Sequence, residues 1–237
     1  MQIEEIQRLH FYQTSPHPCS YLEGQEARTI FMDPAVPVTR AVYSGLATVG
    51  FRRSGAHLYR PACDQCQACL SCRIRVREFR RNKRFRRIWK RNEDLVSRPL
   101  RHLDDPRYFE LYCRYINARH AGGDMHPPSR EQYQSFIEAR SDTTQFHAFY
   151  LQDTLVALAV VDELDHGLSA MYSFFDPELP SRSLGTYMIL WQIERAWRLN
   201  LPYVYLGYWI KECGKMRYKT DFRPLELLLN EKWVLLT

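Results

Sequence analysis

The sequence predicts an α+β fold, with a mixed sheet in the C-terminal part and a smaller, cysteine-rich α/β part at the N-terminus. Two observations predict it. Along residues 99–237, two helical patterns precede three closely spaced strand patterns, and a long helical pattern follows them. Between residues 63 and 91, cysteines and basic residues gather in one stretch that sets the N-terminal part apart. We place the boundary at Arg98-Pro99, which gives domains of residues 1–98 and 99–237.

The composition is that of a packed globular protein. Of 237 residues, 45% are hydrophobic and 14% are aromatic, and a chain of this length buries a sizeable core. No window approaches 18 consecutive apolar residues, and the first residues lack the basic and apolar segments of a secretory signal. We therefore expect neither a membrane span nor export. The seven cysteines then indicate a reducing compartment, the cytoplasm.

Short elements are predicted in the N-terminal part: a strand over residues 27–32, a helix over 37–49 and a strand over 51–59. Gly50 provides a stop for the helix, and the Ser54-Gly55 turn interrupts the second strand. Further along, Ile74 and Val76 alternate with arginines, which predicts a half-buried strand with a basic outer face.

The basic charge of the chain is concentrated in one segment. Residues 73–91 contain eleven Lys and Arg and one acid, Glu78, whereas the remaining residues carry 22 basic and 26 acidic side chains. Phe85, Ile88 and Trp89 recur at helical spacing, so we expect a basic helix with one buried side. Such a surface suits the phosphates of a nucleic acid. A solvated helix face and a targeting signal are the alternatives.

The C-terminal elements follow one another at short intervals. Asp104 or Asp105 caps a first helix with Pro106 in its first turn, and Ser129 opens a second helix through a capping box with Gln132. The remaining elements are strands over residues 145–151, 155–163 and 168–175, a helix over 183–199, a strand over 203–206, a short helix over 212–219 and a strand over 225–236.

This order resembles the acetyltransferase-like (GNAT) fold, in which a mixed sheet splays open and an activated acyl donor lies in the split. That fold carries a pyrophosphate loop of the pattern Q/R-x-x-G-x-G/A before its long helix. Arg182 and Gly185 fit the pattern, but Tyr187 stands where a Gly or Ala lets the backbone approach phosphate. The departure favours an activated acyl donor other than acetyl-CoA.

Several longer stretches resemble the arginyl-tRNA–protein transferase family, and within it the bacterial branch, the aspartate/glutamate leucyltransferases. They are residues 17–22 (HPCSYL), 50–55 (GFRRSG), 59–61 (YRP) with the cysteines that follow, 206–210 (LGYWI) and 215–219 (KMRYK). The resemblance runs from about residue 10 to the C-terminus. It implies transfer of leucine from leucyl-tRNA to the N-terminal Asp or Glu of acceptor proteins, which marks them for degradation by the N-end rule. It also implies a monomeric cytoplasmic enzyme that needs no cofactor for the chemistry besides its co-substrate leucyl-tRNA.

Such a transfer is an aminolysis, in which the acceptor amine attacks an ester carbonyl and the ribose 3′ oxygen leaves. It needs positioning, deprotonation of the amine and stabilisation of the oxyanion. The expected catalytic residues are Tyr172, Asp176, Tyr208 and Lys215, and the expected substrate-binding residues are Arg182, Gly185, Arg119, His120, Tyr218 and Lys219. The expected tRNA contacts are Arg80, Arg81, Lys83, Arg84, Arg86, Arg87, Lys90 and Arg91. A turn residue before Pro177 is the alternative for Asp176, and a solvated surface is the alternative for the basic side chains.

The cysteines form their own pattern, since Cys63, Cys66, Cys69 and Cys72 recur at every third residue. In the family that the sequence resembles, the HPCSYL segment and the first three of these cysteines belong together. We therefore expect Cys19, Cys63, Cys66 and Cys69 to lie close in space. Two hypotheses stay open: a zinc or iron–sulfur site, and a reduced thiol cluster without metal.

Two other functions also stay open at this point. One is a non-catalytic nucleic-acid-binding module with a metal-stabilised basic arm, and the other is an acyl-CoA-dependent N-acetyltransferase. The preference for leucine over arginine comes from the resemblance alone.

Overall fold

The computed structural model describes residues 9–236; residues 1–8, the first of the predicted N-terminal domain, and residue 237 lie outside the described part. Within the described residues, the strands form sheets of eight, four and two strands, and helices pack against them. The predicted α+β class with a large mixed sheet is confirmed.

The large sheet contains β7 (Leu70–Arg75), β8 (Leu95–Leu100), β9 (Thr144–Leu151), β10 (Thr154–Leu164), β11 (Gly167–Phe175), β12 (Tyr203–Trp209), β13 (Leu225–Leu229) and β14 (Lys232–Leu235). Across the sheet their order is β14-β13-β7-β12-β11-β10-β9-β8. Neighbouring strands are antiparallel except β11 and β12, which are parallel because the crossover helix α6 (Leu184–Arg198) joins them. The predicted three-stranded meander corresponds to β9, β10 and β11.

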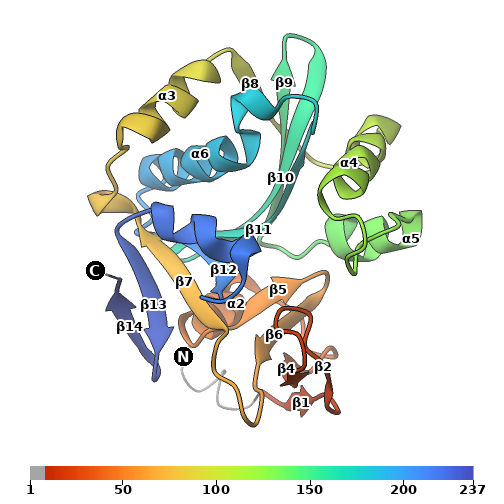
Figure 1. Ribbon diagram of the computed structural model, residues 1–237, viewed down its shortest axis with the longest axis vertical. Helices are drawn as coiled ribbons and strands as arrows, with labels where there is room; N and C mark the ends of the chain where they lie inside the picture. Colours follow the sequence, from red (N-terminus) through yellow and green to blue (C-terminus); the bar gives the residue numbers. More distant parts are fainter. Residues whose placement is uncertain (1–8, 237) are drawn as a thin grey trace.

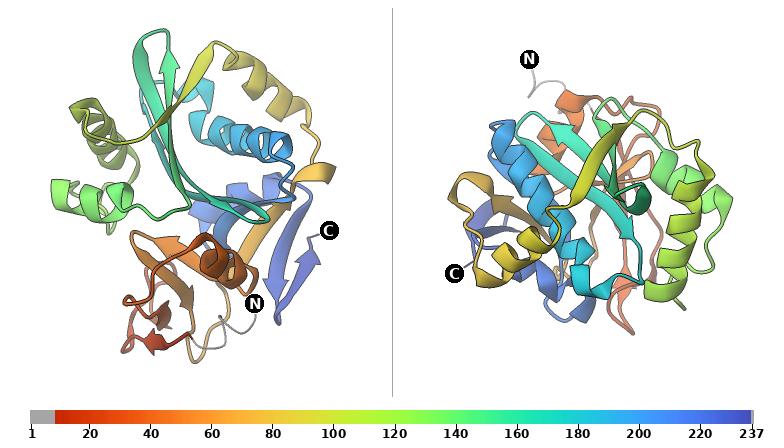
Figure 2. Two further views of the ribbon diagram at one scale, coloured as in Figure 1. Left: turned by 180° about the vertical axis from the view of Figure 1, so that it is seen from behind. Right: turned by 90° about the horizontal axis from the view of Figure 1, so that it is seen from above.

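Helices cover both faces of the large sheet (Figure 1). On one face lie α4 (Pro106–Arg119) and α5 (Arg130–Tyr133), which continues as the π-helical turn η2 (Gln134–Glu138). On the other face lie α6 and the basic helix α3 (Lys83–Arg91), as both views in Figure 2 show. Among the described helices, none combines the length and the apolar composition that a membrane crossing needs.

The N-terminal part has a sheet of its own, which contains β1 (Phe11–Gln13), β4 (Thr29–Met32), β6 (His57–Pro61) and β5 (Arg52–Ser54) in that order, together with helix α2 (Arg40–Thr48). A small ribbon of β2 (His17–Pro18) and β3 (Glu26–Ala27) lies beside it. The core of this part includes Leu164 and Tyr205 from the large sheet. The two parts therefore pack against each other.

Local sequence signals explain where the helices begin. Helices α2, α3, α4 and α5 each follow a residue whose side-chain oxygen accepts a backbone N–H of the first turn; these residues are Thr39, Asn82, Asp105 and Ser129. The predicted caps at Asp105 and Ser129 are thus confirmed. The buried side of α3 consists of Phe85 and Ile88, as the helical spacing predicted, and the third predicted residue, Trp89, is half-buried against the same core.

The structure corrects two predicted strands. A strand around Ile74 is present as β7, which ends at Arg75, but its basic outer face is wrong: β7 lies between β12 and β13, and Arg73 is buried in an ion pair with Glu226. The single strand over residues 225–236 is wrong as well. Asn230 and Glu231 adopt positive φ angles and form a turn, so the segment folds back as the hairpin of β13 and β14.

The boundary drawn at Arg98-Pro99 falls inside β8, which pairs with β9 along its length. β7, from the N-terminal side of that boundary, lies in the middle of the large sheet. The large sheet thus contains strands from both sides, and the division into folding units of residues 1–98 and 99–237 stays a prediction.

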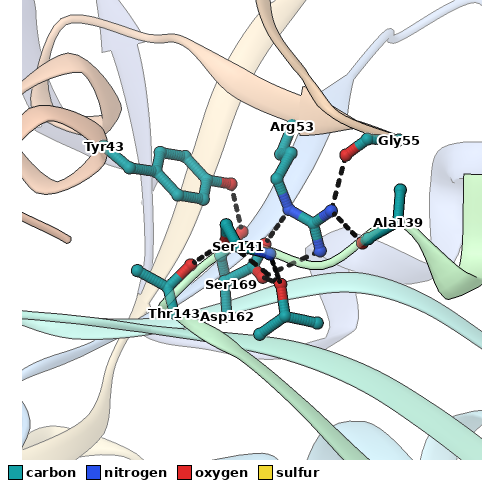
Figure 3. A network of polar contacts seen from close by, with 9 residues as sticks. Tyr43, Arg53, Gly55, Ala139, Ser141, Thr143, Asp162 and Ser169 are labelled. Carbon is teal, nitrogen blue, oxygen red and sulfur yellow. Dashed lines mark hydrogen bonds and ion pairs between the residues drawn. The ribbon is translucent and has the colours of Figure 1, made fainter. Parts of the chain in front are cut away.

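One buried ion pair joins the N-terminal sheet to the large sheet. Arg53 of β5 donates from Nε and Nη2 to the two carboxylate oxygens of Asp162 on β10, both at 2.8 Å (Figure 3). Their side chains are only 1% and 0% exposed. Arg53 Nη1 also donates to the carbonyl oxygens of Gly55 and Ala139, so every nitrogen of the guanidinium group has an acceptor.

Replacing Arg53 by Ala is expected to destabilise the protein by about 3–5 kcal/mol, because the Asp162 carboxylate stays buried without its partner. Urea unfolding followed by circular dichroism measures this loss. The matched control is Arg40→Ala on α2, whose pairs with the half-buried Glu163 and the exposed Asp165 are open to solvent on the Arg40 side and contribute about 0–1 kcal/mol. Equal losses for the two variants would contradict the assigned role of Arg53.

His147 on β9 makes the stability depend on pH. Its side chain lies against Trp191 of α6, with 4.7 Å between ring centroids, and it is 3% exposed. Burial lowers the pKa of His147 to about 4, and the positive charge of Arg195 acts in the same direction. Between pH 4 and about 6.5 the unfolded chain therefore binds a proton at this position that the folded chain does not bind.

Stability is expected to rise with pH across this window, and the His147 contribution is lost as pH falls from 6.5 toward 4. In the variant His147→Phe the slope should be lower by up to about 1.4 kcal/mol per pH unit, which urea midpoints at several pH values would measure. The exposed His102 supplies the control variant His102→Asn, expected to keep the full slope. An unchanged slope in His147→Phe would show that His147 is not the responsible group.

Candidate functional site

The large sheet opens between its two parallel strands. β11 and β12 pair only at their starts, through Gly167 with Tyr203, Leu168 with Val204 and Ser169 with Tyr205. Beyond these pairs β11 stays bonded to β10, and β12 stays bonded to β7. The sheet therefore splays apart, as expected for the acetyltransferase-like fold, and the facing backbone edges of β11 and β12 are released from each other.

A cavity of about 730 Å³ lies at this opening. Its walls are the diverging halves of β11 (Ser169–Ser173) and β12 (Leu206–Tyr208), the first turn of α6 with Gly185 and Thr186, and the 3-10 segment η4 (Gly214–Asp221). The end of α4 closes one side with Arg119 and His120. A cavity of this size accommodates a terminal nucleoside or a short peptide end.

The charged groups of the cavity have one sign. Its basic lining residues are Arg52, Arg53, Arg119, His120, Lys215 and Lys219, and none of the described lining residues is Asp or Glu. Six tyrosines complete much of the wall: Tyr21, Tyr59, Tyr115, Tyr172, Tyr208 and Tyr218. The cavity is therefore suited to anionic groups and to flat rings that stack on aromatic side chains.

The buried residues Tyr208 and Lys219, together with a bend at Gly207, fix the shape of the cavity at β12. Gly207 has φ of +77°, and the register of β12 against β7 shifts between Tyr205 and Tyr208. The Tyr208 hydroxyl donates to the carbonyl oxygens of Gly50 and Tyr59, at 2.8 and 3.1 Å, while Lys219 Nζ donates to the Tyr208 carbonyl. The 215–219 and 206–210 stretches are thus held together beside the opening.

Two basic lining groups have a lowered pKa. Burial lowers the pKa of Lys219, and the nearby positive charge of Arg52 adds to this, whereas Cys72 acts in the opposite direction. Burial also lowers the pKa of His120, and the charges of Lys215 and Arg119 add to it. Both groups are thereby shifted toward the neutral form that accepts a proton.

The structure brings most of the predicted site residues to this cavity. Tyr172, Tyr208, Lys215, Gly185, Arg119, His120, Tyr218 and Lys219 all line it. Asp176 and Arg182 are not among the lining residues. Asp176 binds Arg114 and accepts the Glu178 N–H, which is the turn role considered as its alternative. Arg182 forms a two-pronged ion pair with Asp94.

Sequence reasoning missed other lining residues. Arg52 and Arg53 lie in the GFRRSG stretch, but nothing in the alternation of β5 indicates that it faces the opening of a distant sheet. Tyr115 faces the cavity from α4, where it lies beside the buried stripe of that helix and was not singled out. One sequence feature could have pointed to Arg52 and Arg53: they are adjacent arginines in a short strand that ends in a glycine turn.

The basic helix α3 lies next to the segments that border the cavity. Arg84 pairs with Asp221 of η4 at 2.6 Å, and Arg91 donates to the Ser181 carbonyl in the turn before α6. Arg80, Lys83, Arg84, Arg86, Arg87, Lys90 and Arg91 are exposed. Arg81 differs, since it packs on Trp89 and pairs with Glu194. Most of the predicted tRNA contacts thus form an exposed basic surface beside the opening.

Five of the cysteines gather in one place. Burial raises the pKa of Cys69 to about 12, and Cys19, Cys63, Cys66 and Cys213 add to the rise, so these thiols lie near one another. Within residues 9–236, no group of three or more His, Cys, Asp or Glu side chains is arranged to hold a metal ion. All these cysteines are free thiols. The choice between a metal site and a plain thiol cluster stays a prediction.

Comparisons with known proteins identify the family of this chain. The chain matches the models for the N terminus and the C terminus of arginine-tRNA-protein transferase, over residues 17–87 and 107–229. It is 53% identical over 232 residues to the aspartate/glutamate leucyltransferase of Pseudomonas fluorescens (strain Pf0-1), covering 98% of this chain and 99% of that one. For the protein of the same name from Pseudomonas aeruginosa (strain LESB58), the identity is 52% over 233 residues, with the same coverage.

Among solved structures, FemX has a similar fold, with a TM-score of 0.53 and 7% identity, over 95% of this chain and 87% of that one. At this identity the likeness concerns the fold alone. The two family models together span most of the chain, and they contain the stretches that hold the cavity and the first half of the basic helix. The resemblance inferred from the sequence is confirmed: the chain belongs to the arginine-tRNA-protein transferase family.

Proposed function

We propose that this protein is an aminoacyltransferase that moves leucine from leucyl-tRNA to the N-terminal Asp or Glu of acceptor proteins in the cytoplasm, acting as a monomer. One observation carries the proposal: the cavity at the opened sheet is lined by cations and tyrosines, with no Asp or Glu among its described lining residues. Both substrates bring anions to that place, the tRNA its phosphates and the acceptor its acidic side chain. The names of the relatives support the choice of leucine and of acidic acceptors.

The chemistry needs a positioned ester and a neutral amine. The α-amine attacks the carbonyl of the leucyl ester, the new C–N bond forms, and the ribose 3′ oxygen leaves with its electron pair. The proton that the amine loses passes to a lining base, for which His120 and Lys219 qualify by their lowered pKa, and a proton finally reaches the 3′ oxygen. Released backbone N–H groups of β11 or β12 are suited to stabilise the oxyanion.

The other predicted residues take roles that fit their places. Tyr172 and Lys215 line the cavity and remain our candidates for contact with the reacting groups. The Tyr208 hydroxyl is already bonded to two carbonyl oxygens, so we assign Tyr208 the positioning of the cavity wall. The exposed cations of α3 bind the sugar-phosphate backbone of the tRNA.

The direct test is transfer of labelled leucine from leucyl-tRNA to peptides that begin with Asp or Glu. Incorporation is expected, and ribonuclease treatment of the donor should abolish it because the ester is carried by RNA. A pure nucleic-acid-binding module gives no incorporation. An acetyltransferase gives ribonuclease-insensitive transfer from acetyl-CoA, so either of these results would reject the proposal.

Charge reversal on α3 tests the tRNA surface. The double variant Arg86→Glu and Arg87→Glu is expected to weaken tRNA binding and to lower the slope of log K against log salt by roughly one for each phosphate that the variant no longer neutralises. Reversal at Arg84 should act in the same way, with the added repulsion of its partner Asp221.

Filter binding between about 50 and 200 mM salt measures this slope, because binding through phosphates weakens steeply over that range. Arg107→Glu on α4 is the control, since Arg107 pairs with Asp105 on a helix away from α3. A slope unchanged from wild type in the α3 variants would remove this helix from the interface.

A further inference from the structure

Arg52 is a buried cation whose hydrogen-bonding capacity is incompletely used. It lies on β5 and is 3% exposed. Its Nη1 donates to the carbonyl oxygens of Ala47 and Phe51, at 3.1 and 2.6 Å. Its Nε and Nη2 are buried and have no hydrogen-bond partner in the part of the chain that the structure describes. A buried guanidinium group with unpaired N–H donors costs free energy unless an acceptor binds those donors.

The neighbouring buried arginines show what is missing. Arg53 binds both oxygens of Asp162, and Arg73 pairs with Glu226 at 2.6 Å. For Arg52, no ion pair occurs within residues 9–236. The protein thus supplies a carboxylate to two of these buried arginines and none to the third among the described residues.

Arg52 lies at one end of the opening in the large sheet. Arg52 lines the cavity, and its guanidinium carbon lies 4.7 Å from the ring centroid of Tyr205. Tyr205 is the last residue of β12 that pairs with β11 before the sheet opens. Arg52 therefore marks the closed end of the split, whereas Arg119 and Lys215 are exposed cavity residues. A single side chain can reach this closed end, but a polynucleotide backbone is suited to the exposed basic surface of α3.

We propose that Arg52 binds the side-chain carboxylate of the acceptor's N-terminal Asp or Glu and is the residue that makes the acceptor site selective for acidic residues. The inference rests on the proposed function. A guanidinium fork matches the two oxygens of a carboxylate, and its free donors Nε and Nη2 are the pair that forms such a bidentate contact. An Asn or Gln side chain offers one acceptor oxygen and no charge, so it leaves the buried cation uncompensated and is rejected.

The test compares binding and transfer for Arg52→Gln, Arg52→Lys and wild type. Calorimetry without tRNA measures the affinity for otherwise identical peptides that begin with Asp or with Asn. Wild type should bind the Asp peptide at least tenfold more tightly, and Arg52→Gln should bind both alike. The second readout is kcat/KM for leucine transfer to Glu and Gln peptides, whose ratio should fall toward one in Arg52→Gln while the affinity for leucyl-tRNA stays that of wild type.

Arg60→Gln is the matched control, because Arg60 also donates to a backbone carbonyl, that of Val49, from the adjacent strand β6, and does not line the cavity. It should keep the acidic preference.

Thermal unfolding of Arg52→Gln should occur at no lower temperature than in wild type, since an uncompensated buried charge has been removed. If Arg52→Gln does not fold, Arg52→Lys decides: it keeps the charge but loses the fork, so its Asp affinity should fall, and an unchanged affinity contradicts the proposal.

Several outcomes separate the possible errors. Acidic preference retained in Arg52→Gln overturns the inference and leaves the proposed function standing. Loss of leucyl-tRNA binding with the acidic preference intact assigns Arg52 to a tRNA phosphate and also overturns it. Equal binding of Asp and Asn peptides by wild type overturns it directly. Preferred binding of Asp peptides by wild type, abolished in Arg52→Gln but without any leucine transfer, supports Arg52 as the acidic-residue binder and rejects the proposed function.

Discussion

The structure depends on how early β11 and β12 stop pairing. These strands are parallel neighbours for three residue pairs, after which each follows its own antiparallel partner. Gly167 permits the close approach at the root of the pair, because a Cβ there would lie 2.7 Å from the Tyr203 carbonyl oxygen. The opening that follows separates the backbone edges of β11 and β12 at the cavity, where residues of α6, η4 and the N-terminal sheet meet. The cavity is thus a consequence of strand pairing, and the side chains around it only decide its chemistry.

Charge balance distinguishes Arg52 from the other buried arginines. Arg53, which also lines the cavity, and Arg73 are buried with their own carboxylates, and both pairs join separate elements of the fold. At the opening, Arg52 lacks such a partner among the described residues, whereas Lys219, whose pKa burial and the charge of Arg52 lower, donates to the Tyr208 carbonyl. Unbalanced buried charge costs stability, so its presence at the opening indicates that the anions arrive with the substrates.

Local features of the fold were predictable from the sequence, whereas distant pairings were not. Caps at Asp105 and Ser129 and the meander of β9, β10 and β11 follow from short-range patterns, and the structure contains them. The buried place of Arg73 on β7 depends on Glu226, which lies 153 residues further along the chain and which no local pattern reveals. The hairpin of β13 and β14 was missed because its turn contains Asn230 and Glu231 but no Gly or Pro to mark it.

The site residues also divide into those that the sequence predicted and those that it did not. Residues that belong to motifs, such as Tyr208, Lys215 and Lys219, line the cavity as expected. Asp176 and Arg182 were chosen for residue type and position in the fold, but each has found a partner of opposite charge nearby. The sequence analysis did not single out Arg52, because no sequence pattern shows that a buried arginine lacks a carboxylate partner. Only the folded structure shows this.

The most decisive measurement is a crystal structure of the protein with a non-hydrolysable leucyl-adenosine amide. We expect density for the leucyl group between the diverging halves of β11 and β12, with the adenosine against the tyrosine-lined wall and the ribose toward α3. Density on another face of the large sheet, with the opening between Ser169 and Tyr208 unchanged, would contradict the assignment of this cavity as the site of transfer.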